Sequence, residues 1–388
     1  MYMKRMSFSL LITIIMVFTY SCNRKRDAIT ENLITYQVKA SDDSHFQWNE
    51  FVDKVEFIQL ETNMQSIIGE FETGVVDKDG IFILHWSNLA LPTFSAKLLN
   101  FDLTGKFIRE IGQQGRGPGE FLEMRDFCIV NNQVYTLDYQ KIHCYNKNTG
   151  GYIDSWSIKD ETGFNPANFA VFDRDNYYLW ATNPAEQGES EEQYYHLRGM
   201  RSGEILSYYF EYKSSTTSNQ RFFPCGDDSF NIRPIDGEDI IYKLTKDSLQ
   251  ASFFIDFGNM ALSAERVKEL KNSGERNAFY KSNAFKNIRN ILELKDYIYF
   301  ECVGPESFGY EGLVNKQTGE VKFGRNRYGI SPKLFYSDGR KILYGYYDPS
   351  FITNMQAGDN LMEKCFNDVR SLKVDESDNL IIVKIHMK

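Results

Sequence analysis

The stretch from Ile111 to Phe121, Ile-Gly-Gln-Gln-Gly-Arg-Gly-Pro-Gly-Glu-Phe, is the one whose residue types most suggest chemistry. Glycine-rich loops can bind phosphate through their backbone amides. This loop lacks the Gly-Lys-Ser/Thr of a phosphate-binding loop and the spacing of a dinucleotide fingerprint, and Pro118 has no backbone N–H to donate. We therefore interpret it as a tight link between strands, in which glycines supply positive φ angles. Its charged and flexible positions are candidate ligand-binding residues: Arg116, Gly117 and Glu120, with Arg125 at the next strand.

Patterns for catalysis or metal binding are not evident elsewhere in the sequence. The five histidines are not paired at metal-ligand spacing, and neither Gly-x-Ser-x-Gly nor His-Glu-x-x-His occurs. We predict no catalytic residue, no metal ligand and no cofactor. Several aromatic residues near the longer loops could stack on a sugar or a protein partner, or pack on the strands beneath: Trp86, Phe94, Phe222 and Phe223. Of these, Trp86 joins the candidate ligand-binding residues.

The N-terminal residues have the pattern of an export signal. Lys4 and Arg5 precede the apolar run Ser7–Phe18, which has the length of a signal-peptide core and is short for a membrane span. Cys22 follows a small residue, as in a bacterial lipoprotein signal; an ordinary secretory signal with an incidental cysteine is the alternative. We expect residues 1–21 to be removed and Cys22 to be lipidated, so that the lipid anchors the protein to a membrane.

Composition limits the partners and the covalent chemistry. The net charge is −9 and no dense Lys/Arg stripe is present, which argues against a nucleic-acid partner. Five cysteines remain after Cys22, an odd number without a Cys-x-x-Cys pair, so we predict buried free thiols rather than disulfides. They are Cys128, Cys144, Cys225, Cys302 and Cys365.

Two kinds of β-hairpin alternate along the chain. The first places a polar turn before an apolar strand: Val76–Leu84, Ile129–Leu137, Val171–Leu179, Leu294–Phe300, Phe335–Leu343 and a degenerate copy near Asp236–Glu238. The second is more polar and closes on glycine: Asp102–Gly105, Asn146–Gly150, Arg198–Gly203 and Asn315–Gly319. One hairpin of each kind makes a unit of four antiparallel strands, named a to d. Six a–b hairpins therefore predict six blades of a β-propeller.

The glycine-rich loop after the first unit resembles the signature loop of the six-bladed β-propeller lipoproteins of Bacteroidetes, which are NHL-like proteins mostly without assigned activity. The resemblance extends to Val55–Thr62 and to the ending Asp378–Ile385, although the proline common after Asn379 is missing. In this family an acidic run after the cysteine tends to accompany surface export. Asn23–Arg26 is basic instead, so the resemblance favours a periplasm-facing envelope lipoprotein.

Ring closure assigns the chain ends. The last blade needs a fourth strand, and Val55–Leu60 is expected to supply it beside the C-terminal strand Leu380–His386. We predict an edge strand at Leu33–Val38 and a helical turn at Trp48–Asp53. The domains are then a signal peptide (1–21), a tether with an N-terminal segment (22–50) and the propeller (51–388).

The long insertions are all predicted to leave one face of the ring, since they join strands b and c or neighbouring blades. They are Ser87–Ser95, Asn183–Glu192, Lys213–Gln220, Gly258–Lys286 and Asp348–Ser377. Small helices are expected at Ser263–Leu270 and Asn360–Val369.

These features together predict a membrane-anchored binding or scaffold module for a protein or glycan ligand, with no catalytic motif. Two alternatives stay open. One is a metal-assisted lyase or hydrolase of NHL or lactonase type with its site at the channel mouth, because metal ligands in a propeller assemble radially. The other is a structural subunit of an envelope complex.

Overall fold

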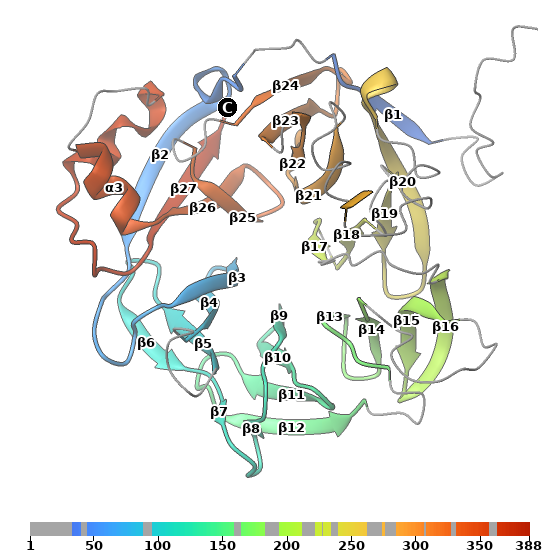
Figure 1. Ribbon diagram of the computed structural model, residues 1–388. Coiled ribbons are helices and arrows are strands. Elements are labelled where there is room, and N and C mark those ends of the chain that lie inside the picture. The colour runs from blue at the N-terminus through green and yellow to red at the C-terminus, as the bar shows by residue number, and fades with distance from the viewer. Residues whose placement is uncertain are drawn as a thin grey trace, which may run out of the picture.

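The chain forms a ring of six blades around an axis (Figure 1). The computed structural model describes residues 33–39, 45–87, 95–158, 164–182, 194–211, 222–226, 228–233, 240–261, 274–275, 285–305, 308–326, 331–356 and 363–388. Each blade contains four antiparallel strands, and blade 4 carries a fifth strand in parallel. The predicted all-β, six-bladed β-propeller is confirmed.

Each blade begins with its inner strand at the axis and ends at the rim. Blade 1 contains β3 (Glu70–Val76), β4 (Ile81–Trp86), β5 (Ala96–Phe101) and β6 (Phe107–Glu110). Blade 2 contains β9 (Asp126–Val130), β10 (Gln133–Leu137), β11 (Lys141–Asn146) and β12 (Tyr152–Ser157). Blade 3 contains β13 (Asn168–Val171), β14 (Asn176–Trp180), β15 (Tyr195–Arg201) and β16 (Glu204–Glu211).

The second half of the ring also takes strands from the N-terminus. Blade 4 contains β17 (Phe223–Pro224), β18 (Phe230–Ile232), β19 (Ile240–Leu244), β20 (Leu249–Asp256) and β1 (Ile34–Gln37). Blade 5 contains β21 (Lys286–Glu293), β22 (Tyr297–Val303), β23 (Gly309–Asn315) and β24 (Val321–Arg325). Blade 6 contains β25 (Lys333–Ser337), β26 (Ile342–Tyr347), β27 (Ile381–Met387) and β2 (Val52–Gln59).

The glycine-closed turns have the hydrogen bonds and the positive φ angles expected of them. Asn146 Oδ1 accepts hydrogen bonds from the backbone N–H groups of Asn148 and Thr149, both at 3.0 Å. Asn315 Oδ1 accepts from the two equivalent residues of blade 5. The closing glycines Gly150 and Gly319 have φ angles of 70° and 73°, which a Cβ would strain. The predicted c–d turns of both blades are confirmed.

The N-terminal segment clasps three consecutive blades. β2 pairs antiparallel with β27 and completes blade 6, as predicted for ring closure. Upstream, His45 bridges to Arg325 at the outer edge of blade 5. β1, which corresponds to the predicted edge strand, pairs in parallel with β20 of blade 4. The segment thus runs around the rim from blade 4 to blade 6 (Figure 1).

Blade 4 departs from its predicted layout. The expected a–b turn at residues 236–238 lies outside the described residues, but the strands on either side of it are β18 and β19, the second and third of the blade. The a–b turn is instead at residues 225–229, where Cys225 N donates to Ser229 O at 2.9 Å. β17 is only two residues long, so its sequence carries too little alternation to mark a strand.

The core is divided into six apolar clusters, one between each pair of neighbouring blades. Phe82 and Val134 join blades 1 and 2, for example, and Trp180 and Leu244 join blades 3 and 4. Four of the five cysteines are buried free thiols, as predicted, whereas Cys365 is only partly buried. Because apolar packing lies between blades, the axis itself is left to the inner strands.

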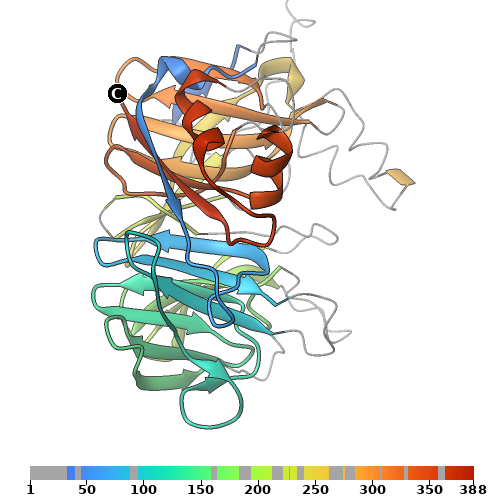
Figure 2. The same cartoon turned by 90° about the vertical axis from the view of Figure 1, so that its left-hand side faces the viewer.

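The helical insertion of blade 6 lies at the rim instead of over the axis. α3 (Pro349–Gln356) and η6 (Lys364–Ser371) stand beside β2 in Figure 2. Phe366 and Val369 of η6 are buried, and Phe366 meets Trp48 of the short helix η3 (Trp48–Glu50) with ring centroids 6.0 Å apart. The helix predicted at Ser263–Leu270 lies outside the described residues. Within the described part of the chain, no helix is both long and apolar enough to cross a membrane.

Candidate functional site

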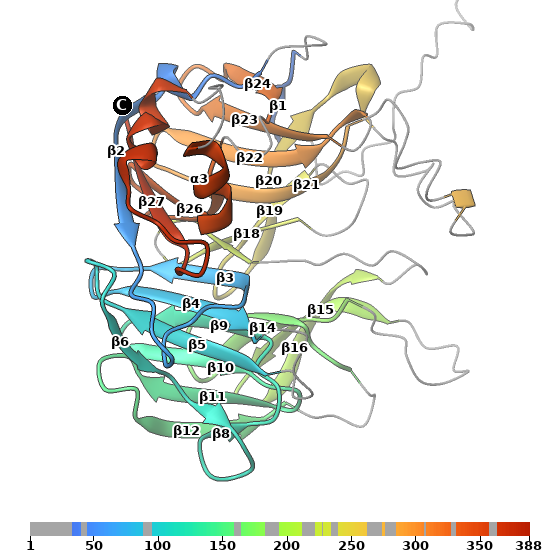
Figure 3. The same cartoon turned by 60° about the vertical axis from the view of Figure 1, so that its left-hand side comes forward.

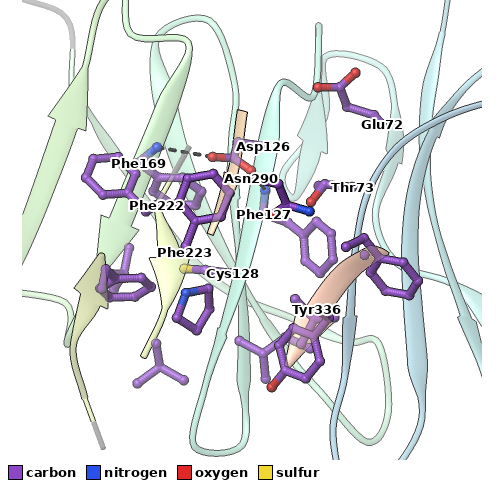
Figure 4. A pocket seen from close by; sticks show the side chains of 18 of the residues that line it. Glu72, Thr73, Asp126, Phe127, Cys128, Phe169, Phe222, Phe223, Asn290 and Tyr336 are labelled. Atoms are coloured by element: carbon purple, nitrogen blue, oxygen red, sulfur yellow. Dashed lines mark hydrogen bonds between the residues drawn. The ribbon is translucent and has the colours of Figure 1, made fainter. Parts of the chain in front are cut away.

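A cavity of about 490 Å³ lies on the axis, lined by the inner strands β3, β9, β13, β17, β21 and β25 (Figure 4). Its volume is within the range of small-molecule sites. The a–b turns of blades 4 and 6 approach each other beside it, since a Cβ added to Gly339 would lie 3.5 Å from the Gly226 Cα. Both glycines have positive φ, so the turns can adopt the backbone that this approach uses.

Three inner strands are interrupted by β-bulges, and each bulge supplies a residue to the cavity wall. On β3 the register shifts between Phe71 and Thr73, which leaves Glu72 as the extra residue. On β25 the extra residue is Phe335. β21 has two shifts, and the second leaves Arg289 without a ladder partner on β22. Bulges redirect side chains and occur often beside functional sites.

Positive charge lies on the blade 5 and blade 6 side of the cavity. Arg289 of β21 and Lys333, the first residue of the neighbouring β25, are both exposed and both line the cavity. The Lys333 Nζ lies 5.5 Å from the ring centroid of Tyr346. Burial raises the pKa of the Tyr346 phenol to about 12, so this ring is neutral at pH 7 and offers its face to the ammonium group.

The acidic residues of blades 1 and 2 are held by donors of the wall. Glu72 Oε2 accepts a hydrogen bond from Trp86 Nε1 at 3.3 Å. Asp126 Oδ2 accepts from Asn168 Nδ2 at 3.3 Å and from Phe169 N at 3.2 Å, a contact visible in Figure 4. Asp126 thereby joins the inner strands of blades 2 and 3. These two carboxylates shape the wall, which Asp228 of blade 4 and Glu301 of blade 5 also line.

Aromatic rings make up much of the remaining wall. Figure 4 shows Phe127, Phe169, Phe222, Phe223 and Tyr336 around the cavity. Phe222 is only partly buried. The polar side chains between the rings include Thr73 and Asn290. A wall of this composition can bind a ring-shaped ligand by stacking and orient it by hydrogen bonds.

A chain of hydrogen bonds leads from the cavity into the interface between blades 5 and 6. The hydroxyl of Tyr299 lies 2.8 Å from Glu301 Oε1 and 3.0 Å from Glu311 Oε1. Glu301 lines the cavity, whereas Glu311 is only 1% exposed. Burial, followed by the neighbouring charge of Glu301, raises the pKa of Glu311 to about 8. Burial also raises the pKa of Glu301, which the hydrogen bonds from Tyr299 and Asn290, and then the positive charge of Arg289, partly oppose.

The far end of this chain reaches the N-terminal segment. Trp48 Nε1 donates to Glu311 Oε2 at 3.3 Å, and Ser331 Oγ donates to the same oxygen at 3.4 Å. Trp48 is fully buried. The carboxyl group of Glu311 therefore joins the clasping N-terminal segment to a chain that begins at the cavity.

The glycine-rich loop lies at the outer rim, between β6 and blade 2, and takes no part in the cavity (Figure 3). Its short strands β7 (Gln113–Gln114) and β8 (Glu120–Phe121) pair in parallel. Arg116 and Gly117 are exposed there, and Glu120 Oε2 accepts a hydrogen bond from Gly117 N at 2.7 Å. The structure therefore separates these three candidates from the axis, because the link from an outer strand to the next inner strand first crosses the rim.

Arg125 and Trp86 lie nearer the cavity but behind its wall. Arg125 donates to Pro166 O at 3.1 Å and to the side chain of Asn165, so it joins the start of blade 2 to the segment before blade 3. Trp86 is partly buried at the end of β4 and holds Glu72. Phe222 and Phe223, which were candidate stacking residues, do line the cavity. Phe94 lies outside the described residues.

The charged residues of the cavity were missed in the sequence. Glu72 and Arg289 are far apart in the chain and have no shared motif, and each stands in a strand whose alternation a bulge interrupts. The only local sign of these residues in the sequence was an interruption in the alternation of polar and apolar side chains along the strand. In the described part of the chain, no group of three or more His, Cys, Asp or Glu side chains is placed to hold a metal ion.

Comparisons with known proteins address the fold and the family. No curated protein matches the sequence. A solved structure from Bacteroides fragilis, described as an exported protein, has a TM-score of 0.72 and 15% identity over 92% of this chain and 99% of that one. The WD40 domain of Neurospora crassa Pan2 covers 88% of this chain and 98% of its own, with 6% identity and a TM-score of 0.40, too low to support an argument. The family model for a domain of unknown function, DUF4934, matches residues 33–386, and the chain therefore belongs to that family.

Proposed function

We propose that this protein is an exported, lipid-anchored binding module that recognises a carbohydrate in its axial cavity. The observation that carries the proposal is the set of bulges on β3, β21 and β25, whose extra residues Glu72, Arg289 and Phe335 all reach one cavity. Phe335 also packs against Phe71 of blade 1, with ring centroids 5.2 Å apart. The bulges at Glu72 and Arg289 give up ladder pairing and place charged side chains on the cavity wall, which favours a role in recognition.

A carbohydrate fits the wall better than a protein segment does. Sugar rings present an apolar face for stacking and hydroxyl groups that both donate and accept hydrogen bonds. The cavity offers the partly exposed aromatic rings of Phe222 and Tyr336 beside Thr73 and Asn290. A protein partner would need a sheet edge, a groove or a flat surface of larger area, whereas this site is a compact space enclosed by inner strands.

Binding is tested by titrating the intact mature chain, in detergent, with a panel of neutral and acidic oligosaccharides. The Phe222→Ala variant should bind any recognised glycan about 5- to 150-fold more weakly, because stacking on one ring is worth about 1–3 kcal/mol. Tyr152→Ala is the matched control, since Tyr152 is an exposed ring at 42% accessibility on the outer strand β12. Absence of binding to every glycan, or equal loss in both variants, would contradict the proposal.

The same preparation tests the two alternatives for function. A metal-assisted lyase or hydrolase predicts a stoichiometric metal by elemental analysis and new reducing ends in the glycan after incubation. A structural subunit predicts co-purification of an envelope complex from native membranes without any glycan affinity. Either result would replace the binding proposal.

The lipid anchor is proposed at Cys22, and the Bacteroides protein of similar fold is described as exported. Cells grown with an alkyne fatty acid should label the wild-type chain and the Cys365→Ser control but not Cys22→Ser. Cys365 is a partly buried free thiol and so controls for cysteine loss. Protection from protease added to intact cells would support the periplasm-facing side, and digestion would support surface exposure.

A further inference from the structure

We infer, on the basis of the proposed function, that the bound carbohydrate is an acidic sugar whose anionic group lies between Arg289 and Lys333. We further infer that its binding is accompanied by uptake of one proton at Glu301. Three features of the cavity carry this inference: the two cations on neighbouring strands, the position of Glu301 beside Arg289, and the hydrogen-bond chain behind Glu301.

The two cations come from neighbouring inner strands and face one space. Arg289 is an extra residue in a bulge of β21, and Lys333 begins β25. Both side chains are exposed and both line the cavity. A guanidinium group binds carboxylate or sulfate oxygens through two parallel N–H donors, and an ammonium group adds a point charge. In a chain with a net charge of −9, two cations in one small cavity form a local site for an anion.

Four carboxylates line the cavity besides the two cations: Glu72, Asp126, Asp228 and Glu301. Asp228 is exposed in the a–b turn of blade 4. Glu72 is held by Trp86, and Asp126 by the start of β13 (Figure 4). Glu301 lies on β22 beside β21 and interacts electrostatically with Arg289. An anion bound at Arg289 therefore competes with Glu301 for the positive charge of this arginine.

The hydrogen-bond chain shows how Glu301 can give up its charge. The Tyr299 hydroxyl has one proton but contacts both Glu301 Oε1 and Glu311 Oε1. It can donate to only one of them, so the other contact needs a proton on a carboxyl group. Glu311 Oε2 already accepts from Trp48 and Ser331, which leaves Oε1 as the protonated oxygen. Glu311 then donates to Tyr299, and Tyr299 donates to Glu301.

An anion bound at Arg289 favours the protonated form of Glu301. The ligand takes over the positive charge of Arg289, which helps to stabilise ionised Glu301, while Tyr299, Asn290, Glu311 and the Tyr346 phenol remain around the carboxyl group. Lys333, on β25, is the other cation lining this cavity, and the anionic group of the ligand pairs with it as well. Glu301 in the complex therefore binds a proton from solvent, and no bond to the ligand is made or broken. Affinity should rise as the pH falls, by up to about tenfold per pH unit.

The experiment measures binding to the intact mature chain between pH 5.5 and 8 with matched probes. These are uronate oligosaccharides (oligogalacturonate, alginate and hyaluronan fragments), sulfated oligosaccharides, and neutral oligosaccharides of the same length. We expect a uronate or a sulfated probe to bind more tightly than its neutral counterpart, and the two acidic classes identify which anion is used. Only the acidic probes should gain affinity on acidification.

Two variants assign the effect to residues. Arg289→Met should weaken acidic-probe binding at least ~10-fold and leave neutral-probe binding unchanged, while Arg116→Met, an exposed arginine on the rim, should change neither. Glu301→Gln resembles the protonated carboxyl, so it should bind acidic probes well and lose the pH dependence. Unchanged thermal unfolding of each variant shows that the ring is intact.

The outcomes separate this inference from the proposed function. Binding of neutral glycans without a preference for acidic ones overturns the anion site and leaves the binding module standing. A preference for acidic probes that survives Arg289→Met, or a pH dependence that survives Glu301→Gln, also overturns the inference. Binding of no glycan at all, neutral or acidic, contradicts both.

Discussion

The glycine-rich link at the rim and the bulged strands at the axis both depart from regular blade geometry, but they use their polar groups differently. In the link, Gly115 N donates to Phe121 O at 2.9 Å, and Glu120 receives the N–H of Gly117. The carbonyl of Gly119 accepts the hydroxyl of Tyr145 at 2.9 Å. The polar groups of the link are thus directed inward, to the link itself and to blade 2.

At the axis, the β-bulges direct polar side chains toward open space instead. The bulges on β3 and β21 place Glu72 and Arg289 on a cavity wall, where Arg289 is exposed to the space a ligand would fill. The comparison teaches that a conspicuous motif can serve only chain geometry, while a site can be assembled from single irregularities in separate blades. Variants of the two regions should therefore differ in kind: rim variants change stability, and axis variants change binding.

Gly119→Ala should have the largest effect on stability among the variants of the rim. Gly119 has a φ of 76°, and a Cβ there would lie 2.6 Å from Cγ of Tyr152, an atom close to the backbone that cannot easily move away. Backbone strain and overpacking together should lower the free energy of unfolding by about 3 kcal/mol. Chemical denaturation measures the loss, and glycan affinity of the folded fraction should be unchanged.

Gly117→Ala is the matched control for this prediction. Its backbone is not in the left-handed region, and its added Cβ would meet only the flexible end of Glu120, at 3.1 Å. A loss within about 0.5 kcal/mol is expected. Equal losses at both positions would mean that the link tolerates no side chain anywhere, and its role as a close-packed turn at Gly119 would be wrong.

The second prediction concerns Glu311, on the axial side of the comparison. Its pKa is about 8 in the folded chain against 4.5 ordinarily, so the folded state binds one more proton than the unfolded state between these values. The contribution of Glu311 to stability should therefore fall as the pH rises from about 5 to 8 and level off above 8, by up to about 5 kcal/mol in total. Glu311→Gln should flatten this dependence and be the more stable protein at pH 8.

Glu120→Gln provides the rim counterpart, because Glu120 receives its hydrogen bonds at a partly exposed site. Unfolding measured at pH 7 and 8, above the range in which the buried His85 and His196 change stability with pH, should show the wild-type slope in Glu120→Gln and a much smaller slope in Glu311→Gln. A slope that persists without Glu311 would place the titrating group elsewhere, and the proton assignment in the Tyr299 chain would lose its support.

The fold was predictable from sequence because its determinants are local. Turns such as 146–150 carry both their asparagine acceptor and their closing glycine within a few residues. The closing strand β2 was predictable from strand counting, since a ring with one three-stranded blade would expose an edge. The layout of blade 4 was not, because β17 and β18 span only two and three residues and too few side chains alternate.

The cavity was not predictable, since no local signal specifies it. Phe222 and Phe223 drew attention as paired aromatics, and they do reach the axis. Arg289, by contrast, follows Ile288 in a strand with two bulges, and only the register with β22 shows that it leaves the ladder. Lys333 and Arg289 meet at one cavity through the closure of the ring, a property of the whole chain.

Tyr145→Phe should have a moderate effect that isolates one contact of the link. The Tyr145 hydroxyl is buried and holds the carbonyl of Gly119. Removing it leaves that carbonyl without this donor, which should lower the free energy of unfolding by about 1 kcal/mol. Tyr152→Phe, whose hydroxyl contacts Ser155 at an exposed position, should lose almost nothing in the same denaturation experiment. A larger loss from Tyr152→Phe would reverse our assignment of which tyrosine holds the link.

Arg116→Ala should have the smallest effect of all, and it tests the comparison most directly. Arg116 is exposed in the link, on the rim and away from the cavity. An exposed side chain that leaves no buried partner unpaired should change stability by less than about 0.5 kcal/mol. Glycan titration should give wild-type affinity at every pH, because the charge is separated from Arg289 by the breadth of a blade and is screened by salt. A clear loss of binding in Arg116→Ala would move the site from the axis to the rim, since no effect on the axial wall could produce it.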